Sequence, residues 1–427
     1  MGILTSLYTG ISGLAGQGEA LAVYGDNIAN ASTTGFKTSR PEFQDVISKS
    51  VKGLLGGNQI GAGMKLSAIT PIFSQGSVIQ TESPTDLAIT GDGFFVLDGT
   101  DGRSYTRNGA FRFDREGKLI TSDGARVMGF EADDLGKIST KLGPVSVDRS
   151  VIDAKKTESV NLFMNLDLRA EKLKEFNIAK PEKTSNAATS VTIYDSAGMA
   201  HSCTAYFNKT EDDVWTWHAV VKGDECNNGK PGELVECATG TLTFDTDGRL
   251  KDQSISKSQF TFNKGAKPDQ VVNFNFGTDK AHGGTGVQVT QYGTNSETYK
   301  TIQDGYTAGT LVGFSFSEEG ILIAHFSNSE SINISQIALT RFENPEGLFK
   351  LGQNRFRDTR SSGEANIGCA QTGGRGRISV KALESSTTDI ASDFINLIQA
   401  QRNFQANGKV ISTTDEMLQE VLNIKRG

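Results

Sequence analysis

Cysteine and histidine are the side chains of this 427-residue chain that most often bind metals or form covalent bonds, and the chain has four of each. Cys203, Cys226 and Cys237 lie in the middle of the sequence, near His201 and His218. Their spacing fits no zinc-ligand pattern, since no two cysteines form a C-x-x-C pair. A disulfide between Cys226 and Cys237, across a loop rich in Asn, Gly and Pro, is favoured over zinc if this region is extracellular. Free buried thiols are the default.

No catalytic motif stands out elsewhere. The sequence has no nucleophile elbow, phosphate loop or metalloprotease motif, and residues 373–376 lack the glycine spacing of a dinucleotide loop. The other histidines, His282 and His325, are scattered, and spacing singles out no pair of carboxylates. We therefore predict that the protein is not an enzyme and has no cofactor and no metal site.

Charge and hydropathy exclude two further classes of protein. The formal net charge is −7 without any basic run, which argues against nucleic-acid binding. No Lys or Arg precedes Lys37, and glycines interrupt the apolar residues at the start, so neither a secretory signal nor a membrane span is expected there. The chain has 48 Gly but only 8 Pro, which indicates many β-turns.

Heptad repeats at both ends of the chain are the strongest structural signal. Apolar residues recur at Leu7, Leu14, Leu21 and Ile28 with Leu4 and Ile11 beside them, and at Ile390, Leu397, Phe404, Ile411 and Leu418 with Phe394 and Leu422 beside them. This period predicts helices over about 4–28 and 389–425 whose seams pack on other helices, within one subunit or between subunits. Because the first helix is rich in glycine, we expect it to be stable only when its seam is paired. A surface helix of a globular domain is the alternative for the second.

Capping signals refine the second helix. The Ser/Thr run at 385–388 suits its N-cap. Thr413 and Glu416 form a capping box that could start another helix, but the unbroken seam favours one helix throughout.

Between the helices the sequence predicts β-structure. A turn motif of the form Phe, polar, any, acid, Gly, any, Leu recurs at 113–119, 244–250 and 316–322, and its glycine is expected at positive φ. Asn108-Gly109 predicts a tight hairpin. Alternation places Trp215 and Trp217 on one strand face, which is expected to form a sheet core.

The β segments that flank the middle of the chain are expected to fold together, which gives a nested order of domains. The fold class is therefore mainly β with a terminal α-helical coiled coil. The expected parts are 1–30 with 389–427 as the helical domain, 31–72 as an extended connector, 73–150 with 308–388 as the first β domain, and 151–307 as an inserted β domain.

Several segments resemble signatures shared by bacterial flagellar rod and hook proteins. These segments are 26–37 (DNIANASTTGFK), 91–96 (GDGFFV), 105–111 (YTRNGAF) and 399–407 (QAQRNFQAN). Segment 191–198 (VTIYDSAG), followed by Tyr206, Phe207 and Trp215, is similar to the outer domain of hook proteins, and 309–311 and 342–348 also match the hook pattern. The chain is thus identified as a member of the hook group. A distal rod protein with an unusual insertion is the runner-up.

The resemblance implies a function in swimming motility. Hook subunits form a short, curved, hollow tube that joins the rod to the filament and bends while transmitting torque. The terminal helices would line the tube, the connector and first β domain would form its middle layer, and 151–307 would form its outer surface. The implied partners are further copies of the chain, the flagellar type III export apparatus, the hook cap, and the distal rod and hook–filament junction proteins.

The resemblance also implies export to the cell exterior without a cleaved signal peptide. Phe43 and Ile47 fit the Phe-x-x-x-hydrophobic pattern linked to export-gate recognition, although connector packing explains such a segment equally well. A hypothesis from another class is a secreted glycan-binding or glycan-cleaving module that uses the Trp215/Trp217 face as its platform.

Overall fold

The computed structural model describes residues 2–46, 49–50, 59–133, 136–147, 150–173, 175–227 and 229–424, without the side chains of residues 2–3, 49–50 and 59–60. The chain divides into two compact units. Unit 1 comprises Met1–Asp148, Gly313–Ala324 and Ser331–Gly427, and unit 2 comprises Arg149–Val312 and His325–Glu330. The predicted fold class, mainly β with a helix at each end, is confirmed. The finer division into helical domain, connector and β domains stays a prediction.

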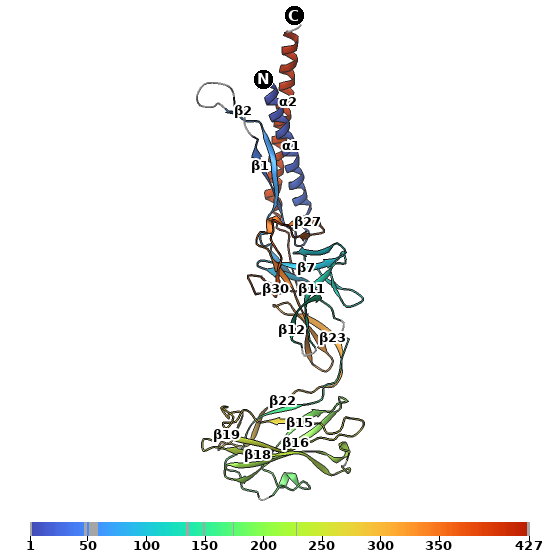
Figure 1. Ribbon diagram of the computed structural model, residues 1–427, viewed down its shortest axis with the longest axis vertical. Coiled ribbons are helices and arrows are strands. Elements are labelled where there is room, and N and C mark those ends of the chain that lie inside the picture. Colours follow the sequence, from blue (N-terminus) through green and yellow to red (C-terminus); the bar gives the residue numbers. More distant parts are fainter. Residues whose placement is uncertain are drawn as a thin grey trace. The chain divides into compact units, whose positions relative to one another are not determined.

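Two long helices of unit 1 lie side by side (Figure 1). They are α1 (Gly2–Ala29) and α2 (Ile390–Ile424). Gly10 of α1 faces Ile411 of α2, while Gly18 faces Phe404, so the helices run antiparallel. Neither helix, over its described length, combines the length and apolar character that a membrane span requires.

The N-cap of α2 is Asp389, and the predicted cap in the preceding Ser/Thr run is wrong. The Asp389 carboxylate accepts the backbone N–H groups of Ala391 at 3.0 Å and Ser392 at 3.3 Å. Ser386 Oγ instead accepts the backbone N–H of Thr388, at 3.2 Å. A carboxylate at the N-cap accepts hydrogen bonds from free backbone N–H groups, and its negative charge is attracted by the positive end of the helix dipole.

The prediction that the second helix is continuous is confirmed, since α2 passes through Thr413 without a break. The Thr413 hydroxyl donates to the carbonyl of Lys409, one turn back, at 2.8 Å. It therefore bonds within the helix rather than capping a new one.

The segment predicted as an extended connector contains a β-hairpin. Strand β1 (Ser39–Asp45) pairs antiparallel with β4 (Met64–Pro71), and β2 (Lys49–Ser50) pairs with β3 (Gln59–Ile60). In Figure 1, β1 runs beside the two helices. A Cβ built at Gly16 of α1 would lie 2.6 Å from Met64 Cε and 3.4 Å from the Phe43 ring, so this glycine lets the hairpin approach α1.

The remaining strands of unit 1 form its β region. They are β5 (Val78–Gln80), β6 (Leu87–Thr90), β7 (Phe94–Gly99), β8 (Gly102–Thr106), β9 (Arg112–Phe113), β10 (Leu119–Ile120), β11 (Arg126–Ala132), β12 (Ile138–Pro144), β25 (Ser331–Ile337), β26 (Leu339–Arg341), β27 (Phe349–Gly352), β28 (Arg355–Arg357), β29 (Asn366–Gly368), β30 (Arg377–Val380) and β31 (Ala382–Glu384). A 3-10 helix, η3, spans Pro345–Gly347, and β23 (Gly309–Phe316) and β24 (Ile321–Phe326) contain residues of both units.

Strand β7 is the centre of this region. The sheet order around it is β25-β11-β7-β8-β28-β27. Phe95 and Leu97 belong to one buried cluster, and Phe94 and Val96 belong to another on the opposite face. Burial on both faces explains why this strand is a continuous apolar run rather than an alternating one.

The recurring turn motif behaves as predicted in all three copies. Gly117, Gly248 and Gly320 have φ of 76°, 72° and 76°. In the first copy, Asp114 N donates to Lys118 O at 2.9 Å, which closes the turn. The glycines are therefore required by backbone conformation.

The hairpin predicted at Asn108-Gly109 is wrong. Strand β8 before it pairs with β7 and β28, whereas β9 after it pairs with β10. Gly109 has another role, because a Cβ built on it would lie 1.5 Å from the carbonyl oxygen of Leu87. This glycine permits a close backbone approach rather than a turn.

Unit 2 contains two sheets around a shared core. Its strands are β13 (Val151–Ile152), β14 (Ser159–Asn165), β15 (Ala187–Tyr194), β16 (Ala200–Glu211), β17 (Val214–Lys222), β18 (Leu234–Phe244), β19 (Leu250–Ser258), β20 (Asn273–Asn275), β21 (Val289–Thr290) and β22 (Glu297–Gln303), with 3-10 helices η1 (Pro181–Lys183) and η2 (Gly223–Glu225). Strands β15 to β19 form a five-stranded antiparallel sheet in chain order, and β14 pairs with β20, β21 and β22 in a four-stranded sheet.

The core of unit 2 contains both tryptophans of the chain. Trp215 and Trp217 are fully buried, and the Trp217 ring centroid lies 5.0 Å from that of Phe274 in the other sheet. The sheet-core prediction is confirmed. A glycan platform on this face is excluded, because rings with no exposed surface cannot stack on a sugar.

Candidate assembly site

The heptad residues of the two helices divide into two groups. Of the two main series that recur every seven positions, all residues except Ile390 are half-buried: Leu7, Leu14, Leu21, Ile28, Leu397, Phe404, Ile411 and Leu418. The remaining predicted seam residues are exposed: Leu4, Ile11, Ile390, Phe394 and Leu422. One line of the repeat is thus covered within the subunit, while the other is left on its surface.

Glycines allow the helices to approach closely. A Cβ built at Gly13 would lie 2.7 Å from Asn407 Nδ2, and one at Gly10 would lie 3.1 Å from Ile411 Cγ1. On α2, Gly408 faces Leu14 in the same way, at 4.0 Å. Small residues at an interhelical contact bring the helix axes together.

Helix α2 also exposes apolar residues that the heptad analysis missed. They are Ile395, Ile398, Val410, Met417, Val421 and Ile424, and Tyr8 is exposed on α1. Phe394 is 54% exposed and Leu422 is 61% exposed. Apolar groups lining a long helix in this number are typical of a surface that another protein covers. In the sequence, these residues are marked only as apolar residues that lie outside the heptad positions of the helix.

A buried amide joins the end of α1 to the start of β1. Asn27 Nδ2 donates to the Ser39 carbonyl at 2.9 Å, and Asn27 Oδ1 accepts the Ser39 N–H at 2.9 Å. The same amide lies 3.4 Å from Asp393 Oδ1 of α2, and Thr388 Oγ1 donates to the Asn27 carbonyl at 3.2 Å. One side chain therefore connects three segments, which explains its place in the signature at 26–37.

Asp393 is a buried carboxylate at this junction. Burial raises its pKa, the Asn27 donor opposes the rise, and the nearby Asp389 charge adds to it. The charged form of Asp393 is thus less favourable in the folded chain than in water.

Below the helices, Glu384 of β31 binds two buried cations. Lys37 Nζ lies 2.7 Å from Glu384 Oε1, and Arg107 Nη1 lies 3.4 Å from Oε2. The side chains of Lys37 and Glu384 are fully buried, and that of Arg107 is 4% exposed. Burial lowers the pKa of both Lys37 and Arg107, while the Glu384 charge opposes this in each case.

Further hydrogen bonds support this buried cluster of charges, in which only Arg107 Nε has no partner among the described residues. Lys37 Nζ donates to the Ser74 carbonyl at 2.6 Å, and Arg107 Nη2 donates to the Gly91 carbonyl at 2.8 Å. Glu384 Oε1 also accepts the backbone N–H of Gly76, at 2.8 Å. Buried ions need such partners, because desolvation costs several kcal/mol per ion.

Glycine at position 35 brings two signature segments together. Gly35 has φ of 69°, and its N–H donates to the Glu384 carbonyl at 2.8 Å. A Cβ built there would lie 2.7 Å from Asn108 N. Segments 26–37, 91–96 and 105–111 thus meet at Glu384, a residue that sequence reasoning missed because no local pattern marks it.

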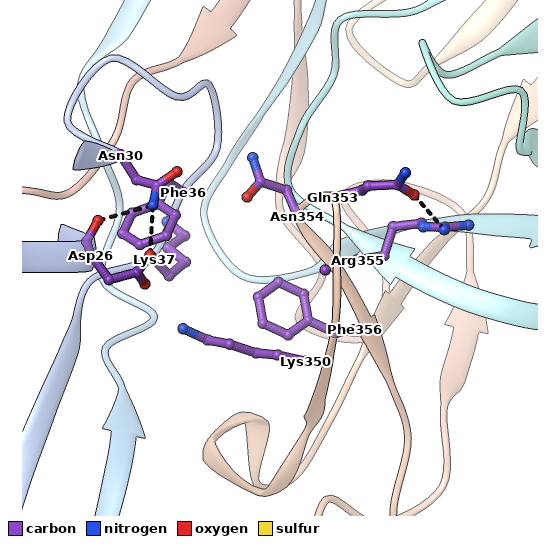
Figure 2. Close-up of a pocket in the computed structure, with 10 residues that line it drawn as sticks. Asp26, Asn30, Phe36, Lys37, Lys350, Gln353, Asn354, Arg355 and Phe356 are labelled. Atoms are coloured by element: carbon purple, nitrogen blue, oxygen red, sulfur yellow. Dashed lines mark hydrogen bonds between the residues drawn. The ribbon is translucent and has the colours of Figure 1, made fainter. Parts of the chain in front are cut away.

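A cavity of about 260 Å³ adjoins this junction (Figure 2). Lys350 lines it, donates to Ser39 Oγ at 2.7 Å, and lies 5.5 Å from the Phe36 ring centroid. Burial lowers the pKa of Lys350, and the charge of Asp26 at the end of α1 opposes this. These contacts hold β27 against Phe36 and the start of β1. No two of its lining residues form a nucleophile–base pair, so we interpret the cavity as part of the structural junction between α1, β1 and β27.

One of the two residues of the predicted export pattern lies in the described part of the chain. Phe43 lies in β1 opposite Leu66 and is 39% exposed. Ile47 lies outside the described residues. The export role stays a prediction.

Three cysteines meet in unit 2. Cys203, Cys226 and Cys237 are buried and free. Burial raises the pKa of Cys203 to about 12. A hydrogen bond from Cys237 lowers the pKa of Cys226 and raises that of Cys237. The structure thus has adjacent thiols rather than a bond at this position, and the Cys226–Cys237 disulfide stays a prediction.

Four family models match the sequence. Their descriptions and matched residues are "Flagella basal body rod protein" at 7–37, "Flagellar hook protein FlgE/F/G D1 domain" at 88–195, "Flagellar basal body protein FlaE D2 domain" at 165–306, and "Flagellar basal body rod FlgEFG protein C-terminal" at 380–424.

Curated relatives match along the whole chain. The flagellar hook protein FlgE of Borreliella burgdorferi is 32% identical over 457 residues, covering 99% of this chain and 100% of that protein. FlgE of Escherichia coli K12 is 32% identical over 425 residues, covering 97% and 98%. The crystal structure of Helicobacter pylori flagellar hook protein FlgE2 matches with a TM-score of 0.53 at 15% identity, over 72% of this chain and all of that one. This last match supports the fold.

Proposed function

This chain belongs to the flagellar hook protein FlgE family, and we propose that its copies polymerise into the curved, hollow tube that transmits torque from rod to filament. Members of the family are structural subunits of the flagellar hook, an extracellular part of the flagellum. The chain accordingly has no enzymatic activity in this proposal. Its working parts are surfaces and rigid joints.

The observation that carries the proposal is the apolar surface of the paired helices. Leu4, Ile11, Phe394 and Leu422 continue the heptad pattern yet remain exposed in the single subunit. Burying an exposed leucine or phenylalanine side chain is worth about 1.5–3 kcal/mol. Helices of neighbouring copies would cover these residues and form the continuous inner wall of the tube.

The buried charges below the helices suit a part that carries load. Lys37, Arg107 and Glu384 come from three distant segments, and both cations pair with Glu384 out of solvent. Pulling the helices away from the β region would expose or unpair these charges, at a cost of about 3–5 kcal/mol. In this proposal, the cluster passes torque between the inner tube and the β region of the same subunit.

The inserted segment 151–307 is proposed to form the outer surface of the hook. Its largest apolar side chains, including Trp215, Trp217 and Phe274, are gathered in its own core. Small, polar contacts between such domains would slide as the tube bends, whereas large apolar contacts would hold it rigid.

Assembly requires further partners. We propose export through the flagellar type III apparatus without cleavage, with Phe43 and Ile47 as the export-gate pattern. The hook cap, the distal rod and the hook–filament junction proteins would then contact the growing or finished tube.

A pair of matched variants tests the polymerisation surface. Phe394→Asp places a charge on α2, and Val271→Asp places one on unit 2 at a side chain of equal exposure, 54% against 55%. Each gene would replace the native copy, with hooks scored by electron microscopy and the exported chain measured in the culture medium. We expect Phe394→Asp cells to release monomer but build no hooks, and Val271→Asp cells to build normal hooks.

Two results would contradict the proposal. Hooks of normal length in Phe394→Asp cells would show that this face is not a subunit contact. If Phe394→Asp impaired the straight rod but left the hooks unchanged, the result would favour the alternative of a distal rod protein.

A further inference from the structure

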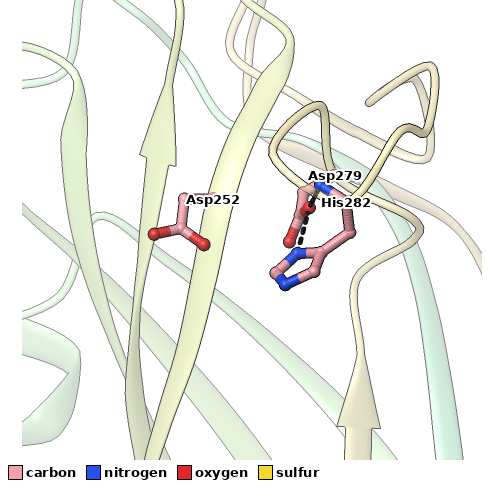
Figure 3. Close-up of side chains that lie close together, drawn as sticks. All are labelled: Asp252, Asp279 and His282. Atoms are coloured by element: carbon pink, nitrogen blue, oxygen red, sulfur yellow. Dashed lines mark hydrogen bonds and ion pairs between the residues drawn. The ribbon is translucent and has the colours of Figure 1, made fainter.

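Three side chains that can bind metal ions converge in unit 2 (Figure 3). Asp252 lies on β19, and Asp279 and His282 lie on the loop that follows β20. One ligand atom from each lies within 4.8 Å of the other two. Asp252 precedes Asp279 by 27 positions in the sequence, so no ligand spacing links β19 to the loop.

The buried carboxylate of Asp279 points to a ligand. Its side chain is 1% exposed. Oδ1 accepts the backbone N–H of His282 at 2.8 Å and lies 2.6 Å from His282 Nδ1. Oδ2 is buried and has no hydrogen-bond partner among the described residues. An unsatisfied buried carboxylate oxygen is costly, and coordination of a cation satisfies it.

The backbone holds the loop in place without a metal ion. Lys280 N donates to the Leu250 carbonyl at 3.2 Å, and Ala281 N donates to the Lys251 carbonyl at 3.0 Å. Leu250 N in turn donates to the Gly286 carbonyl at 3.0 Å. The ligand atoms are therefore positioned by main-chain bonds, as a preformed site requires.

The nearest cationic side chain of the loop is engaged elsewhere. Lys280 Nζ binds the carboxylate of Asp245 and lies 3.9 Å from Asp247 Oδ2. The negative charge of Asp252 and Asp279 thus faces the imidazole of His282.

We propose that Asp252, Asp279 and His282 bind a divalent transition-metal ion of the zinc type. Carboxylate oxygen and imidazole nitrogen are both zinc ligands, and a zinc site with three protein ligands holds water in the fourth position. Calcium and magnesium prefer sites built of oxygen alone. Asp252 and His282 are exposed, so the ion would enter from solvent and join the loop to β19.

The test is calorimetric titration of the full chain, freed of metal by a chelator, with zinc chloride and, separately, calcium chloride. Melting followed by tryptophan fluorescence gives a second readout, because Trp215 and Trp217 both lie in the core of unit 2. We expect one zinc ion per chain, a higher melting temperature with zinc, and much weaker binding of calcium.

Variants locate the site. His282→Ala and Asp252→Asn should each weaken zinc binding by at least about tenfold, since even an outer partner of a metal ligand is worth that much. His218→Gln is the matched control, because His218 Nδ1 lies 2.5 Å from Glu236 Oε1 but, among the described residues, His218 belongs to no group of three possible metal ligands. It should bind zinc as the unaltered chain does. Asp252 is exposed and asparagine keeps its shape, so the metal-free melting temperature of Asp252→Asn should match that of the unaltered chain.

Two outcomes would overturn the inference. One is the absence of zinc binding. The other is binding that persists in His282→Ala and Asp252→Asn but falls in Cys226→Ser, which would place the ion at the buried thiols.

Discussion

Replacing Glu384 with Gln is expected to lower the free energy of unfolding of unit 1 by about 3–5 kcal/mol, the usual cost of removing one partner from a buried ion pair. The carboxylate accepts hydrogen bonds from Lys37, Arg107 and Gly76 at 2.7, 3.4 and 2.8 Å. Glutamine keeps the shape but removes the charge, so two buried cations would face a neutral amide. A domain is typically stable by only about 5–15 kcal/mol, so the loss is a large share of the total.

Hydrogen exchange followed by mass spectrometry measures this change in each unit separately. Peptides from β6 and β31 report on the site of the charges, and peptides containing Trp215 and Trp217 report on unit 2 as an internal reference. The control is Glu131→Gln, which removes a pair with Lys141 at 3.0 Å whose side chains are 43% and 76% exposed. Exposed pairs of this kind are worth about 0–1 kcal/mol.

A comparable loss of protection in Glu384→Gln and Glu131→Gln would refute the reasoning. So would an equal loss in the unit 2 peptides, because the buried charges lie within unit 1.

Three further predictions follow from the same structure. Gly13→Leu should separate α1 from α2 and speed exchange in both helices, whereas Gly25→Leu should not, since nothing lies within 4 Å of a Cβ built at Gly25; equal exchange in the two variants would contradict this. Under oxidising conditions Cys226 and Cys237 should form a disulfide, visible as a cross-linked peptide in non-reducing mass spectrometry, and a fully alkylated pair after oxidation would count against it. The folded-state pKa of Asp393 is raised above 3.8, so its contribution to stability is present at low pH and is lost as the pH rises through the folded pKa. Asp393→Asn should therefore flatten that pH dependence of helix protection without loss at neutral pH, and an unchanged acid profile would show that another group titrates.

The features that sequence reasoning predicted correctly depend on local patterns. Both helices follow from heptads that lie within one segment, and the glycines of the three turns follow from a backbone conformation that few other residues adopt. The same locality explains the error at Asn108-Gly109. Asn-Gly is a residue pair typical of tight turns, but glycine is required at position 109 because the Leu87 carbonyl leaves no room for a side chain.

The buried charges and the metal-binding group escaped prediction because their members are distant in the sequence. Lys37 and Glu384 are 347 residues apart, and Arg107 and Glu384 are 277 apart. Only folding brings them together, and no spacing rule links them. The exposed side of the helices was likewise hidden, since a heptad indicates that residues pack but does not say which of them pack within the subunit.

The most direct test of the account is immunogold electron microscopy of purified hook–basal bodies, with an antibody to residues 151–307. We predict gold along the short curved tube outside the outer ring, because the inserted segment is proposed to form the hook surface. Gold confined to the straight rod, or no gold on intact particles, would contradict the central claim.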